Sequence, residues 1–140
     1  MIKKLLILIS YIFLISNSLL AKNLYFEEGI NLFKDKKFQE AKFKFEQEIV
    51  LNPKSEISYL YLSKIFKQLD KKQLQENNLN TVILLNPNNE EANFNLARLK
   101  LENSDYKKSK EINDKLSTFC KKFCVESKRL KIEIENLSKK

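Results

Sequence analysis

Two Asn-Pro steps, 34 residues apart, constrain this chain more than any other feature. The segments Val50–Pro53 and Leu84–Pro87 each consist of two apolar residues followed by Asn-Pro, and they hold the only prolines in 140 residues. Proline lacks an amide hydrogen and disfavours helix in the preceding residue, so each step marks a helix end. Amphipathic runs lie on both sides of each step. The spacing therefore predicts a repeat of helix pairs.

The composition favours an all-α chain with one folded core. Hydrophobic residues make up 43% of the sequence, which excludes a disordered chain, and one glycine leaves little material for β-turns. Lysine and arginine number 26 against 18 aspartate and glutamate residues, a net charge of +8. At this length, we expect a single domain.

The absence of histidine argues against catalysis and metal binding. Without imidazole the chain lacks the usual general base, the activator of serine and cysteine nucleophiles, and a common metal ligand. No glycine-rich phosphate loop or cluster of metal-ligating side chains replaces it. We therefore expect a protein that is not an enzyme and that binds no cofactor and no metal.

The first 21 residues have the pattern of a secretory signal peptide. Lys3 and Lys4 precede the apolar run 5–15, and small residues follow, so cleavage is expected after Ala21, with Ser18 as the second candidate. The alternative is an uncleaved anchor in the inner membrane that faces the periplasm. The first reading predicts an exported, periplasmic protein. In either location, a basic chain could contact the membrane surface or envelope polymers.

Small and aromatic residues recur in a frame of 34 residues. Gly29, Ser63 and Ala97 are spaced by that period, and each lies where two antiparallel helices would approach closely. The first copy carries the fullest set of marker residues. These are Tyr25, Gly29, Leu32, Ala41, Phe45 and Pro53. The third copy is expected to begin with a capping box made by Asn88 and Glu91.

These residues and their spacing resemble the tetratricopeptide repeat family. The resemblance implies an all-α solenoid of helix-turn-helix units, with copies at 22–55, 56–89 and 90–123. Residues 124–140 then form a C-terminal capping helix with a solvated outer face, which the end of a solenoid requires. Gln75 and Lys72 depart from the family pattern in the second copy, and Lys121 stands in place of proline in the third.

The resemblance also implies a concave groove that binds a peptide or a helix. The first helix of each copy lines this groove in the family, so the residues at the matching positions of this sequence are expected to line it here. They are Phe26, Ile30, Phe33, Lys34, Leu60, Lys64, Lys67, Phe94, Arg98 and Leu101. Such a surface would be apolar with a basic line, and would suit a protein or peptide partner with acidic residues. The alternative is that the aromatic residues pack between helices and the cations are only solvated.

Two other kinds of partner are not expected. The family's clamp for acidic chaperone carboxyl termini needs Lys and Asn where this chain has Phe26 and Ile30, and a basic pair where it has Glu91 and Asn95. A nucleic-acid partner is not expected, because the lysine pairs are scattered, are interleaved with acidic residues and accompany no base-stacking module.

Cys120 and Cys124 leave two alternatives open. Their spacing is not the C-x-x-C of thiol oxidoreductases. An exported chain would meet an oxidising compartment, in which a disulfide would fasten the capping helix. Otherwise the residues are two reduced thiols one turn apart on a continuous helix.

Together these features predict a non-enzymatic adaptor or assembly factor of the cell envelope that binds a peptide or helix in its groove. A different class remains open: a membrane-anchored structural protein that associates with copies of itself. A mass that depends on concentration would favour the second class.

Overall fold

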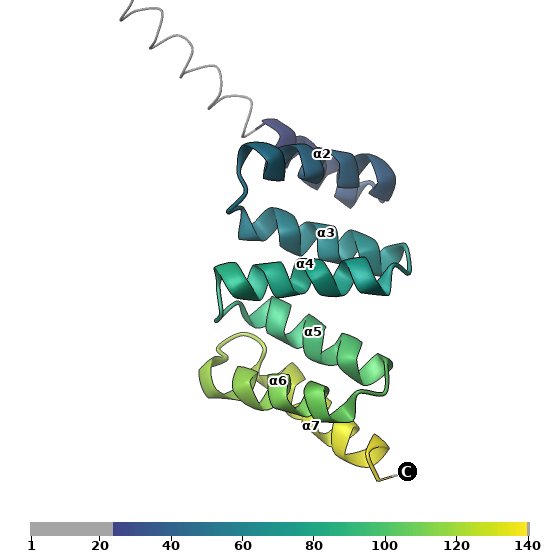
Figure 1. The fold of residues 1–140 in the computed structure, drawn as a ribbon, viewed down its shortest axis with the longest axis vertical. Coiled ribbons are helices and arrows are strands. Elements are labelled where there is room, and N and C mark those ends of the chain that lie inside the picture. The colour runs from purple at the N-terminus through teal and green to yellow at the C-terminus, as the bar shows by residue number, and fades with distance from the viewer. Residues whose placement is uncertain (1–23, 140) are drawn as a thin grey trace, which may run out of the picture. The chain divides into compact units, whose positions relative to one another are not determined.

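The computed structural model describes residues 24–139, and these residues form seven helices and no strand. The first helix spans residues 24–34. The others follow in order along the chain (Figure 1): α2 (Phe38–Leu51), α3 (Glu56–Gln68), α4 (Lys72–Leu85), α5 (Glu90–Glu102), α6 (Tyr106–Phe119) and α7 (Cys124–Leu137). The expected all-α arrangement of helix pairs is confirmed. The expected signal segment and its cleavage site lie outside the described residues.

The chain divides into two compact units, one ending at Ser58 and the other beginning at Tyr59. In the first unit, the helix 24–34 pairs with α2 around Ala41 and Phe45, both fully buried. Gly29 allows the two helices to approach, because a Cβ atom there would lie 3.0 Å from the ring of Phe45. A side chain at this position would therefore press on one aromatic ring, which favours the small residue expected there.

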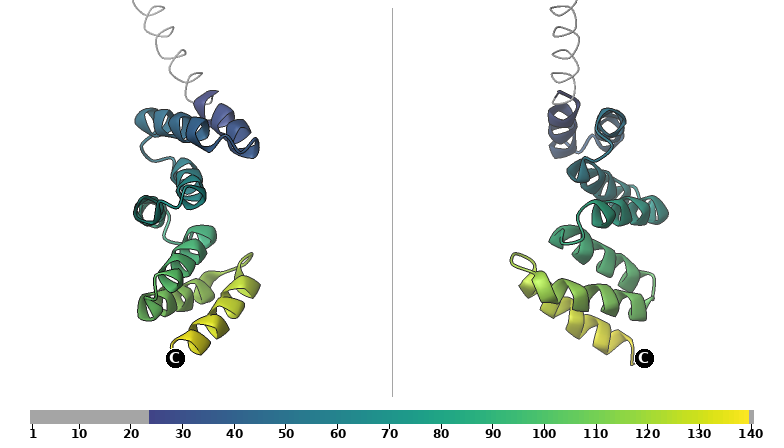
Figure 2. Two further views of the ribbon diagram at one scale, coloured as in Figure 1. Left: turned by 90° about the vertical axis from the view of Figure 1, so that its right-hand side faces the viewer. Right: turned by 60° about the vertical axis from the view of Figure 1, so that its left-hand side comes forward.

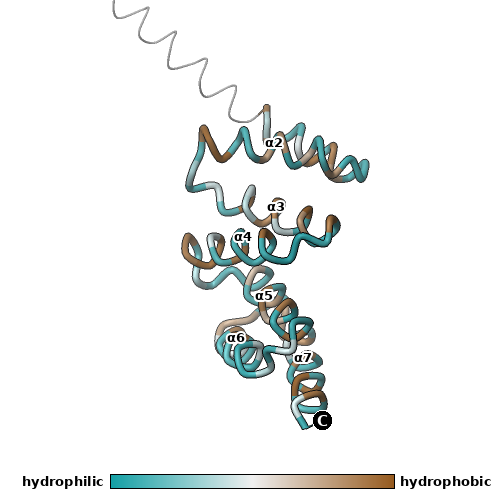
Figure 3. Tube along the Cα trace, turned by 45° about the vertical axis from the view of Figure 1, so that its right-hand side comes forward, coloured by the Kyte–Doolittle hydropathy of each residue, from teal (hydrophilic) through white to brown (hydrophobic). Residues whose placement is uncertain are grey.

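The second unit holds a hydrophobic core built by several helices. Apolar side chains from α4 to α7 meet there, and Leu79, Val82, Leu99 and Leu130 are almost completely buried. Hydrophilic and hydrophobic residues alternate along the trace of the helices (Figure 3). Helices α5 and α6 approach at Ala97, whose carbonyl accepts a hydrogen bond of 2.8 Å from the buried hydroxyl of Ser109.

A buried polar network joins α6 to α7, which lie side by side (Figure 2). Asn113 is fully buried in α6, and its Nδ2 donates to the carbonyl of Ser127 in α7 at 3.0 Å. The Ser127 hydroxyl donates back to Asn113 Oδ1 at 2.9 Å. Because each polar group finds a partner, the network fixes the register of α7 on α6 rather than weakening the core.

The turns inside the helix pairs are closed by residues in the left-handed conformation. Lys36, Asp70 and Ser104 have φ values of 60°, 52° and 61°. These positions recur at the 34-residue period of the chain. The next residue of each turn donates its amide to a carbonyl of the preceding helix, from Lys37 to Leu32 at 2.9 Å in the first turn. This is the geometry that ends a helix with a Schellman motif, here without glycine.

Helix α5 starts one residue later than expected. Its N-cap is Asn89, whose side chain accepts from the amide of Ala92 at 2.9 Å. Asn88 instead donates its own amide to the side chain of Asn86 at 3.2 Å. The capping box expected from Asn88 and Glu91 is therefore wrong, because the Asn-Pro turn already occupies Asn88 and leaves Asn89 free to cap.

Between residues 24 and 139, no helix combines the length and apolar character needed to cross a bilayer. The same residues contain no group of three or more cysteine, aspartate and glutamate side chains arranged to hold a metal ion.

Candidate functional site

Two of the residues expected to line a groove belong to the core of the second unit. Leu60 in α3 and Leu101 in α5 expose only 7% and 5% of their surface. They therefore support the helices that carry the other candidates, and they offer little surface to a partner.

Two of the three expected groove cations in the second unit form ion pairs within the chain. Lys64 Nζ lies 2.7 Å from Glu91 Oε1, and Arg98 Nη1 lies 2.9 Å from Glu133 Oε2. The first pair joins α3 to α5, and the second joins α5 to α7. Lys67 is exposed and has no acidic partner among the described residues. Two of the four cations in the expected basic line are therefore paired with carboxylates of the chain itself.

Phe94 contributes an aromatic surface next to these ion pairs. It lies on α5 and is half-buried, and its ring centroid is 5.4 Å from that of Phe123. Phe123 comes from the loop that precedes α7 and was not expected to take part. The two rings together form an aromatic pair that is partly open to solvent.

The candidates of the first copy lie in the other unit. Phe26 packs edge-on against the buried Phe45, with 6.0 Å between centroids, and Phe33 packs in the same way against Phe38 at 5.6 Å. Ile30 is half-buried and Lys34 is exposed. The two phenylalanines thus pack within a helix pair, which is the alternative that the sequence left open.

Sequence reasoning missed two apolar residues on α7. Val125 and Ile132 expose 57% and 60% of their surface, and a spacing of seven places them on one helix face. A solvated outer face was expected for this helix. The signal was present, because these residues follow Glu91 and Arg98 by one 34-residue period, at positions that line grooves in the family. Lys128 and Arg129 lie between them and are exposed.

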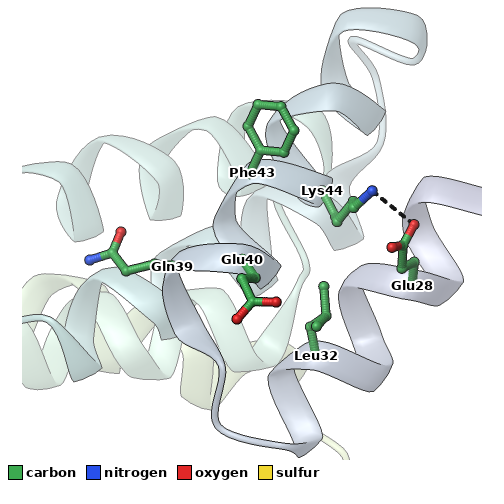
Figure 4. Close-up of a pocket in the computed structure, with 6 residues that line it drawn as sticks. All are labelled: Glu28, Leu32, Gln39, Glu40, Phe43 and Lys44. Carbon is green, nitrogen blue, oxygen red and sulfur yellow. Dashed lines mark ion pairs between the residues drawn. The ribbon is translucent and has the colours of Figure 1, made fainter.

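A pocket of about 380 Å³ opens between the helix 24–34 and α2 in the first unit (Figure 4). Leu32 and the 56% exposed ring of Phe43 provide its apolar walls. Lys44 crosses from α2 to Glu28 at 2.9 Å on its rim. The pocket is large enough for an apolar side chain. The charged groups on its rim, Lys44 and Glu28, already pair with each other within the unit.

The loop between α6 and α7 is bound by a carboxylate of α5. One oxygen of Glu90 accepts hydrogen bonds from the amides of Lys121, Lys122 and Phe123, at 2.9, 2.8 and 2.9 Å. These hydrogen bonds, chiefly from Phe123 and Lys121, lower the pKa of Glu90 against the opposing effect of partial desolvation. The same loop is closed by a disulfide between Cys120 and Cys124, with 5.3 Å between their Cα atoms.

The Glu90 carboxylate should make stability depend on pH. A lowered pKa means that its contribution is complete above the ordinary value of 4.5 and is lost as the pH falls through the lowered folded value. We therefore expect Glu90→Gln to destabilise the protein at pH 7, and the difference from wild type to shrink below about pH 4.5.

Urea unfolding of both proteins at pH 7 and pH 3 would measure this effect. Glu102→Gln is the matched control, because Glu102 is an exposed carboxylate of the same helix and accepts no such hydrogen bonds. A difference between wild type and Glu90→Gln that stays constant with pH would contradict the assignment.

Comparison with known proteins by sequence gave no match. No protein-family model matches the chain. No curated protein sequence matches it either.

Solved structures match the fold. The Arabidopsis OM64 TPR domain has a TM-score of 0.72 at 19% identity, covering 83% of this chain and 98% of that chain. The Yersinia enterocolitica type III secretion chaperone SycD, in complex with a peptide of the translocator YopD, has 0.74 at 13% identity, covering 83% and 91%. The second TPR domain of human RPAP3, in complex with an HSP70 peptide, has 0.71 at 14% identity, covering 88% and 99%.

Proposed function

We propose that this chain, which has the tetratricopeptide fold, is a non-enzymatic adaptor that holds a peptide or helix of a partner protein. Support comes from structural neighbours that are in complex with peptides, a translocator peptide for SycD and an HSP70 peptide for RPAP3. Their identity to this chain is low, so they support the mode of use and not a particular partner.

The observation that carries this proposal is a set of four apolar residues in the second unit that are partly or largely exposed: Phe94 on α5, Phe123 before α7, and Val125 and Ile132 on α7. The side chains of Val125 and Ile132 are each more than half exposed, and the aromatic pair is partly open to solvent. Exposed apolar side chains gain most from burial by a partner, at about 25 cal/mol per Å² of apolar area. We name these four residues the apolar surface.

The charges around this surface favour a partner with apolar anchors over a purely acidic tail. Lys64 and Arg98 already bind carboxylates of the chain, so a partner would have to displace Glu91 or Glu133 to reach them. Lys128 and Arg129 remain exposed between Val125 and Ile132 and can attract scattered acidic residues. Glu91 also stands where the family's carboxylate clamp needs a cation, which argues against chaperone tails.

A location in the cell envelope is part of the proposal. The signal-like segment 1–21 and the net charge of +8 support export to the periplasm, with an inner-membrane anchor as the alternative. The Cys120–Cys124 disulfide is compatible with an oxidising compartment. Fractionation of cells that express a tagged chain, with mass spectrometry of its N-terminus, would distinguish cleavage after Ala21 from retention of the anchor.

The adaptor function is tested by replacing the exposed apolar residues. A photo-reactive amino acid at position 132 would first capture the partner in cells, and a peptide from the cross-linked region would then be titrated into purified protein. We expect Val125→Asp/Ile132→Asp to weaken peptide binding by tenfold or more, because about 2 kcal/mol of apolar burial is lost.

Leu84→Asp is the matched control, since Leu84 is an 81% exposed apolar residue of α4 outside the apolar surface. Both variants should keep the stability of wild type, because the replaced side chains are exposed. Equal peptide binding by wild type and Val125→Asp/Ile132→Asp would place the site elsewhere. Capture of only the chain itself, with a mass that rises with concentration, would favour the self-associating structural protein.

A further inference from the structure

A disulfide and a set of hydrogen bonds both hold the loop that follows α6. The disulfide joins Cys120 to Cys124 and encloses the three residues whose amides bind Glu90. Glu90 is the first residue of α5, so its carboxylate ties this loop to the start of another helix. The covalent bond and the hydrogen bonds therefore hold the same backbone.

The sequence of this loop does not hold the bend by itself. Residues 121–123 contain neither proline nor glycine, and Cys120 and Cys124 are separated by about one helical turn. Cys120 leaves the helix with extended backbone angles, φ −59° and ψ 145°. Three consecutive amides converge on one oxygen only while the loop keeps its bend, and the covalent ring restricts it to few conformations.

The bend also positions a residue of the apolar surface. Phe123 donates the third amide to Glu90, at 2.9 Å, and its ring lies 5.4 Å from that of Phe94. The backbone that Glu90 holds and the ring that faces Phe94 thus belong to one residue. A change in the loop would alter this aromatic pair without any change in α5.

We propose that the Cys120–Cys124 bond is a redox latch on the apolar surface. While the bond is intact, Glu90 holds the loop and Phe123 stays against Phe94. When it is reduced, the loop leaves Glu90, the aromatic pair separates, and the partner is bound less tightly. The last statement rests on the proposed function, whereas the first two concern the chain alone.

Reduction requires a dithiol as the electron donor. Its thiolate attacks one sulfur of the Cys120–Cys124 bond, and a mixed disulfide forms while the other cysteine leaves as a thiolate. The second thiol of the donor then displaces the first cysteine, and the donor becomes a disulfide. Two electrons and two protons end on Cys120 and Cys124 as two thiols.

The latch and the carboxylate should act on each other reciprocally. If an intact disulfide favours the hydrogen bonds to Glu90, then those hydrogen bonds favour the intact disulfide by the same factor. Loss of the carboxylate in Glu90→Gln should therefore make the bond easier to reduce. A disulfide that served only to shorten the unfolded chain would show no such dependence.

Hydrogen exchange of the full chain, with and without dithiothreitol, tests the latch directly. We expect the amides of Lys121, Lys122 and Phe123 to exchange on the order of tenfold faster after reduction, because the closed loop loses its restraint. The proton–proton contact between the Phe94 and Phe123 rings, measured by NMR, should disappear. The amide of Lys108, capped by Asp105 at 3.1 Å, is an internal control and should not change.

Two variants complete the test. Cys120→Ser/Cys124→Ser should show fast loop exchange in both conditions, and Glu90→Gln should be reduced severalfold more at a fixed dithiol concentration. Retention of loop protection and of the ring contact after reduction would overturn the proposal, as would equal reduction of Glu90→Gln and wild type. These readouts need no partner, so a failed search for a peptide would count against the proposed function and not against the latch.

Discussion

Replacement of Phe45 by alanine is expected to destabilise the first unit by about 3–5 kcal/mol, the range for removal of a fully buried aromatic side chain. The ring is completely buried, packs against Phe26 and fills the space left open by Gly29. Its removal leaves a cavity that rigid helices cannot fill by collapse. The loss should be visible as faster hydrogen exchange throughout α2.

Phe43→Ala provides the control for that experiment. Phe43 lies on the same helix two residues earlier, but 56% of its surface is exposed, so its replacement should change stability by only about 0.5 kcal/mol. Exchange in α2 that responds equally to both substitutions would show that helix propensity, and not the buried ring, holds the unit together.

The second large effect is expected from Asn113→Ala, at about 2–3 kcal/mol. The substitution removes both hydrogen bonds between Asn113 and Ser127 and leaves the buried Ser127 groups short of partners. The loss should fall mainly on α7, because the network joins this helix to α6. Hydrogen exchange of the α7 amides should therefore rise more than that of α5.

Asn136→Ala, at an exposed position of α7, is the corresponding control and should leave the exchange pattern unchanged. An Asn113→Ala protein in which α7 remains as protected as in wild type would mean that apolar packing by Leu130 and Ile134 alone holds the helix. The polar network would then contribute only to register.

Much of the fold could be predicted because it depends on local, periodic signals. The two Asn-Pro steps fall at the ends of α2 and α4, and the small residues at positions 29, 63 and 97 are all buried. Side-chain volume explains why the small residues are buried, since helices that approach closely exclude large side chains whatever the rest of the sequence is. Ser109 meets the same requirement opposite Ala97.

The candidate site could be predicted only in outline. The 34-residue period identifies the helix face on which a residue lies, but it does not identify the side chain that contacts it from another helix. Lys64 and Arg98 find Glu91 and Glu133 on other helices, and nothing in their own surroundings in the sequence indicates this pairing. Glu90 illustrates the same limit, since it binds backbone amides, and a backbone amide has no signature in the sequence.

Two exposed apolar residues of the capping helix were not predicted, for a different reason. Leu130 and Ile134 are buried on one face of this helix, and its outer face was expected to be solvated. Extension of the groove positions by one further period would have drawn attention to Val125 and Ile132, both of which are exposed. The periodic surface positions therefore continue into α7.

The left-handed turns are positions at which substitution by glycine could raise the stability of this chain. Lys36, Asp70 and Ser104 each keep a side chain in a conformation that glycine adopts more readily. Each lies in a turn between two helices, outside the apolar surface and the Glu90 loop. Glycine at these three positions would relieve the same local strain in each helix pair, and the gains from sites that share no partners should add.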